Sequence, residues 1–123
     1  MEKMILHQSE LPEGFSYPES FLKAVKYNLV NLPPWHIKDR LWVLSRLAGL
    51  RQRYPTRVLI PFAARRDNDD IACFELGKGE EVQGIHDLAS AGWEQRQTFP
   101  DFWAWFSFIL EEFRWTDVSW FDD

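Results

Sequence analysis

The chain has 123 residues, of which 46% are hydrophobic and 27% charged, a balance that excludes a disordered chain and predicts one globular domain over residues 1–123. Its net charge is −5, but residues 1–66 carry +6 and residues 67–123 carry −11. If the fold separates these halves, the molecule has an acidic face that repels nucleic acid and attracts basic proteins; if it mixes them in space, the charges average out.

Two helices are predicted in the first half of the chain. Residues 16–30 carry a helix-start signal, Ser16 with a Glu three positions later, and then apolar residues at helical spacing. Pro33 and Pro34 cannot continue a helix. Residues 38–54 predict a second helix that ends before a proline. Its expected apolar stripe is Leu41, Leu44, Leu47 and Ala48.

Three strands are predicted next, over residues 57–63, 70–76 and 81–88, because each run is short and rich in apolar and β-branched residues. Short polar or glycine-containing turns separate them, so we expect an antiparallel meander. Pro61 cannot donate a ladder hydrogen bond, and the first strand should therefore lie at an edge or carry a bulge. Residues 89–97 are predicted to be a loop.

The last predicted helix spans residues 98–115, with Thr98 as its expected cap. Phe108 and Trp115 point away from its main apolar stripe, so we expect at least one of them to be exposed or to pack on the N-terminal helices. The predicted class is α+β, with the helices packed on one face of an antiparallel sheet. The stripe expected to lie on the sheet is Phe99, Phe102, Trp103, Phe106, Ile109, Leu110 and Phe113.

The polar block Arg65–Asp70 lies between two predicted strands. As a calcium loop it lacks the internal glycine and the distal bidentate glutamate. Asn and Asp also favour turns by bonding their own backbone. We therefore expect a solvated turn here and no metal site.

Catalysis is not expected. Cys73 lies inside a predicted strand, where a buried thiol is inert. His86 could approach it from the neighbouring strand, but no oxyanion hole or orienting group accompanies the pair. No phosphate loop and no zinc pattern is present. The sequence therefore predicts no catalytic residue, no metal and no cofactor.

The remaining candidates are partner-binding residues. An exposed Trp with acidic neighbours is typical of a protein interface, although Trp93 could instead be packed beneath its loop. With one cysteine, no signal-peptide core and no membrane-length apolar run, we expect a cytoplasmic protein without membrane contact. The candidate partner-binding residues are Asp67, Asp69, Asp70, Asp87, Trp93 and Glu94.

Four segments together resemble the SUKH superfamily, known for bacterial toxin-immunity proteins and a related fungal regulator of cell-wall synthesis. They are YPTRVLIPFA (54–63), DNDDIACFEL (67–76), VQGIHDLASAGWEQR (82–96) and FPDFWAWFSFILEEF (99–113). The family's first two strand motifs correspond to Pro61, Phe62, Ala63, Asp69, Asp70, Ile71, Cys73 and Phe74. Where many members have a Gly-rich acidic turn, this chain has RRDNDD.

The resemblance implies a twisted antiparallel sheet with packed helices and no catalytic residues. It also implies an immunity protein that binds and neutralises a toxin effector domain of nuclease or deaminase type, with a basic toxin domain as the expected partner. The alternative is a regulatory or scaffold module that binds an endogenous protein. A small enzyme using Cys73, His86 or the aspartate cluster ranks last.

Overall fold

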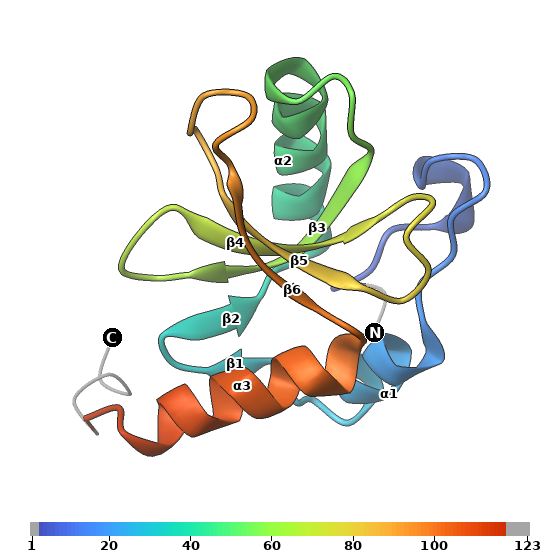
Figure 1. The fold of residues 1–123 in the computed structure, drawn as a ribbon. Coiled ribbons are helices and arrows are strands. Elements are labelled where there is room, and N and C mark those ends of the chain that lie inside the picture. The colour runs from blue at the N-terminus through green and yellow to red at the C-terminus, as the bar shows by residue number, and fades with distance from the viewer. Residues whose placement is uncertain (1–2, 118–123) are drawn as a thin grey trace.

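The computed structural model describes residues 3–117. Its centre is a six-stranded antiparallel sheet in which each strand pairs with its neighbours in sequence, in the order β1 to β6. Helices α1 and α3 lie on one face of the sheet and α2 on the other (Figure 1). The elements are the 3-10 turn Gln8–Glu10, α1 Glu19–Lys26, β1 Asn31–Leu32, β2 Trp35–Ile37, α2 Arg40–Arg53, β3 Leu59–Arg65, β4 Asp70–Glu75, β5 Val82–His86, β6 Gln95–Phe99 and α3 Phe102–Arg114.

The predicted three-strand meander is confirmed as β3, β4 and β5. Ile60 pairs with Phe74 in one ladder, and Ile71 pairs with Ile85 in the next. The register between β3 and β4 shifts from Pro61 to Ala63. Since β3 is an interior strand, the bulge, and not an edge position, is how the sheet accommodates a residue without an N–H donor.

Two parts of the sheet were not predicted. Pro33 and Pro34, which were predicted only to end a helix, form the turn that joins β1 to β2, and the peptide bond between them is cis. Residues 95–99 were predicted as loop and helix start, but they form the edge strand β6 against β5. Four of the five β6 residues are exposed polar residues. Their strand conformation therefore depends on backbone pairing with β5, which a hydrophobic pattern does not reveal.

The expectation that all helices pack on one face is wrong. Strands β3 and β4 bury both of their faces, as their nearly continuous apolar runs allow. Phe62 and Phe74 stack at 4.5 Å between ring centroids on the face covered by α1 and α3. The opposite face packs against α2 through a smaller cluster: Leu50, Tyr54, Leu59, Ile71, Cys73 and Ile85.

The predicted rotation of α3 about its axis is partly wrong. Trp105, left out of the predicted stripe, is 1% exposed, whereas Trp103, included in it, is 40% exposed. Almost every position of α3 up to Leu110 is apolar, so the sequence pattern leaves its buried face ambiguous. The expectation for Phe108 and Trp115 is confirmed, since both side chains are exposed.

The predicted stripe of α2 is partly wrong, although the helix itself is confirmed. Leu44 and Leu47 are half-buried against the larger core, as predicted. Leu41, however, is 72% exposed, and the most buried positions of the helix are Val43 and Leu50. Aspartates cap the N-termini of α2 and α3. The Asp39 carboxylate accepts from Trp42 N, and the Asp101 carboxylate accepts from Ala104 N. The prediction that Thr98 caps α3 is therefore wrong.

Candidate protein-binding loop

The two oppositely charged halves of the sequence mix in space. Arg57, from the basic half, pairs with Glu75 and Glu94 of the acidic half at 2.9 Å each. Arg65 pairs in the same way with Glu112 at 2.6 Å. Of the two alternatives left open by the sequence, the structure supports averaging of the charges, because the principal basic side chains neutralise acidic ones internally.

The polar block between β3 and β4 is a turn stabilised by its own side chains. Asp67 pairs with Arg65 at 2.8 Å, and the Asn68 side chain accepts from Asp70 N at 2.8 Å. The Asp70 carboxylate contacts His86 Nδ1 at 2.8 Å, and Asp69 is exposed. Within residues 3–117 no three His, Cys, Asp or Glu side chains gather as metal ligands. Asp67, Asn68 and Asp69 are exposed, and this exposure confirms the predicted solvated turn.

Cys73 and His86 do not form a pair. In the β4–β5 ladder Cys73 lies opposite Gln83, whereas His86 lies opposite Asp70, three residues along the strand. The Cys73 thiol is fully buried beneath α2, and this burial raises its pKa well above the usual value. Such a thiol is neither ionised nor accessible at neutral pH.

The loop of residues 87–94, which joins β5 to β6, is anchored at its start by Asp87. This carboxylate is fully buried, and it accepts from Arg46 at 2.7 Å and from Arg53 at 2.8 Å, both on α2. Although burial opposes its charged form, the two guanidinium hydrogen bonds prevail, so the pKa of Asp87 is lowered. Asp87 therefore ties the loop to α2, and its carboxylate is not on the surface.

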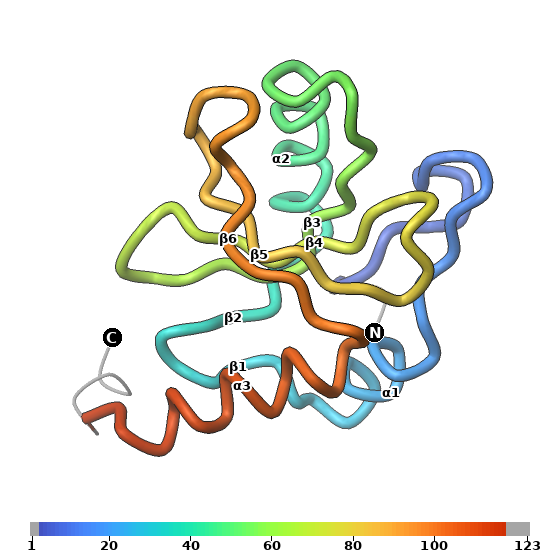
Figure 2. Tube along the Cα trace, in the orientation of Figure 1, coloured from blue at the N-terminus to red at the C-terminus, as the bar shows by residue number. Residues whose placement is uncertain are grey.

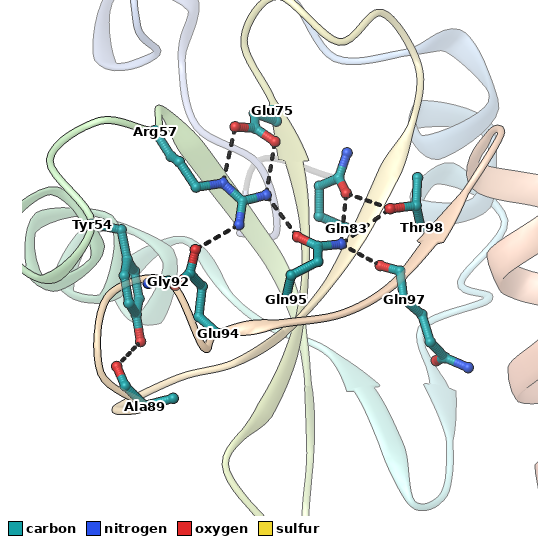
Figure 3. A network of polar contacts seen from close by, with 10 residues as sticks. All are labelled: Tyr54, Arg57, Glu75, Gln83, Ala89, Gly92, Glu94, Gln95, Gln97 and Thr98. Carbon is teal, nitrogen blue, oxygen red and sulfur yellow. Dashed lines mark hydrogen bonds and ion pairs between the residues drawn. The ribbon is translucent and has the colours of Figure 1, made fainter.

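The loop is anchored at its other end by Glu94 (Figure 3). The Glu94 carboxylate is buried and accepts from Arg57 at 2.9 Å and from Gly92 N at 2.7 Å. Burial opposes ionisation, but the hydrogen bond from Arg57 prevails and lowers the pKa of Glu94. Arg57 also binds Glu75 through two hydrogen bonds and donates to the Gln95 side chain at 2.8 Å.

Between these anchors the loop presents apolar side chains to solvent. Trp93 is 81% exposed and Leu88 is 62% exposed. The alternative in which Trp93 packs under its loop is therefore wrong. The Tyr54 hydroxyl donates to Ala89 O at 2.7 Å, and Trp93 N donates to Ser90 O at 2.9 Å. Figure 2 shows the loop running beside the C-terminal end of α2.

Of the six candidate residues, the structure gathers three on this loop and leaves three in or beside the β3–β4 turn. Leu88 is the last residue of a predicted strand, and nothing in the sequence singled it out. Nothing in the sequence connected Arg46 and Arg53 of α2 with this loop. Their partner carboxylate lies 34 to 41 positions away, so local spacing could not identify the pairs.

Asp87→Asn tests the loop anchor. The substitution keeps the shape but removes the charge that Arg46 and Arg53 share, and we expect a loss of about 2–3 kcal/mol in the free energy of unfolding at pH 7. Because the folded pKa is lowered, this contribution is complete above the ordinary value of 3.8 and disappears as the pH falls through the folded pKa. In urea unfolding, we expect the difference in unfolding free energy between variant and wild type to be smaller below pH 3 than at pH 7. An equal difference at both pH values would contradict the anchoring role of Asp87.

Comparison of the chain with known protein families, with curated proteins and with solved structures finds no match. Among residues 3–117, no helix is both long and apolar enough to cross a membrane.

Proposed function

We propose that this chain is a non-enzymatic protein-binding domain, a SUKH-like immunity protein that binds and neutralises the effector domain of a bacterial toxin. The observation that supports this most directly is Trp93, exposed on a loop whose two ends are held by buried ion pairs. Tryptophan is among the residues that most often dominate protein interfaces.

The anchoring favours binding because the loop is already ordered before a partner arrives. Ordering a flexible loop on association reduces affinity, and a preformed loop avoids that loss. Asp87 and Glu94 act in this proposal as positioning residues beneath the surface. The exposed side chains of the loop make the contact.

The proposed partner is a basic toxin domain in the cytoplasm, and nucleic acid and membranes are not proposed as ligands. The net charge of −5 supports this choice, since opposite net charges accelerate diffusional encounter. Because the principal basic and acidic side chains pair with each other inside the chain, they add little attraction to a partner that is already bound. We therefore expect the net charge to affect the association rate more than the stability of the complex.

Co-expression with the product of the neighbouring gene, the expected toxin, tests the proposal. We expect wild type and Trp115→Ala, a matched exposed tryptophan on a different element, to restore bacterial growth. Trp93→Ala should protect poorly, because it removes at least about 2 kcal/mol of binding free energy. Continued killing with wild type, and no complex on a sizing column, would contradict an immunity role. An unbiased pull-down that recovers housekeeping proteins would instead favour the regulatory or scaffold alternative.

A further inference from the structure

Leu88 has an unfavourable backbone conformation without an evident benefit to the fold. Its φ is +74°, in the left-handed region that favours glycine. The one other non-glycine residue with positive φ in the described chain is Asn28, a residue type that tolerates it. The Leu88 side chain is mostly exposed, so its own burial offsets little of the strain. Strained residues that persist on a surface are often functional.

The surrounding structure holds Leu88 in this conformation. Its N–H donates to the Asp87 carboxylate at 2.8 Å, the same group that binds Arg46 and Arg53. Gly49 of α2 lies close to the same guanidinium, since a Cβ there would come within 2.9 Å of the flexible end of Arg53. The Leu88 conformation is therefore tied to the contact between Asp87 and the arginines of α2.

The charge beside Leu88 is positive, unlike that of the chain as a whole. Arg46 and Arg53 share the single Asp87 carboxylate, and their side chains remain 31% and 30% exposed. Arg46 donates only one of its N–H groups to Asp87, and its guanidinium also lies 5.1 Å from the Trp42 ring. Donors that point to solvent at the rim of an apolar contact are suited to a partner carboxylate.

We propose that Leu88 and Trp93 form a two-residue anchor that inserts into an apolar pocket of a protein partner, with a carboxylate of that partner at the pocket rim pairing with Arg46 or Arg53. This rests on the proposed protein-binding function, but not on the partner being a toxin. It also specifies the contact: the patch that meets the loop is apolar and locally acidic, even where the partner as a whole is basic.

Selection of a phage-displayed random peptide library on the full chain tests this without knowledge of the natural partner. We expect the enriched peptides to combine large apolar residues with Asp or Glu. Their affinity should fall at least about tenfold with Leu88→Gly and with Trp93→Ala, the range of interface hot spots. Leu41→Ala and Trp115→Ala, which truncate matched exposed side chains elsewhere, should change affinity less than about twofold. Replacing the peptide carboxylate by its amide should also weaken binding.

Leu88→Gly separates this role from a structural one. Because glycine accepts the positive φ, the variant should bind more weakly and yet melt about 2–6 °C higher than wild type. Failure to enrich any peptide, enrichment of basic peptides, or affinity unaffected by both loop variants would each overturn the inference. Those results leave the co-expression test of the immunity role unaffected, so the two proposals fail separately.

Discussion

Arg57→Ala should lower the free energy of unfolding by about 3–5 kcal/mol, the range measured when one partner of a buried ion pair is removed. Its guanidinium serves two buried carboxylates, Glu75 and Glu94, and both lose their principal counter-charge together. Arg57→Lys should recover only part of the loss, because an ammonium group cannot reproduce the two-pronged contact with Glu75. Arg51→Ala, an exposed arginine on α2, is the control and should remain within about 0.5 kcal/mol of wild type in urea unfolding.

Lowering the pH should reduce the difference in unfolding free energy between wild type and Arg57→Ala. In wild type the pKa of Glu94 is lowered, so its contribution is complete above the ordinary value of 4.5 and is lost as the pH falls through the folded value. In the variant, burial without its counter-charge raises the folded pKa of the Glu94 carboxyl, and its protonation then stabilises the folded state as the pH falls. Urea unfolding between pH 7 and pH 3 measures this difference. A difference in unfolding free energy that stayed constant or increased toward pH 3 would contradict the pairing of Arg57 with Glu94.

Trp105→Ala should destabilise the protein by about 3–5 kcal/mol, whereas Trp103→Ala, two positions away on the same helix, should cost less than about 1 kcal/mol. Trp105 packs edge-on against Phe62 at 5.0 Å and against Trp35 at 5.6 Å between ring centroids. Its truncation opens a cavity in the centre of the larger core. Trp103 keeps much of its surface in water.

Chemical denaturation of the two tryptophan variants measures this difference directly. Equal losses, or a larger loss for Trp103→Ala, would mean that α3 is rotated about its axis toward the face predicted from the sequence. Phe108→Ala is a second control, since its ring is exposed and contacts Phe99 at 5.3 Å at the edge of the sheet. We expect a loss as small as that of Trp103→Ala.

The amino-acid sequence alone was sufficient for the features that depend on neighbouring residues. It identified the three α-helices, the central meander and a constraint at Pro61, which left an edge position or a bulge open, because apolar runs, turn residues and a missing N–H act within a few positions. It also identified the solvated turn at Asp67 to Asp70, since Asn68 and Asp67 bond groups two residues away. Features of this kind depend on residues that are close together in the chain, so the sequence alone can predict them.

Tertiary packing decided the rest. The strand β6, the buried faces of α2 and α3, and the placing of helices on both faces of the sheet follow from contacts between distant segments. The clearest case is the loop of residues 87–94, where sequence alone could not distinguish buried acids from exposed ones. Asp87 and Glu94 are internal anchors because arginines 34 to 41 positions earlier reach them, and Trp93, which lies between them in the chain, is exposed. A charge in a sequence has no partner until the chain folds, and its partner determines whether it lies inside the protein or on its surface.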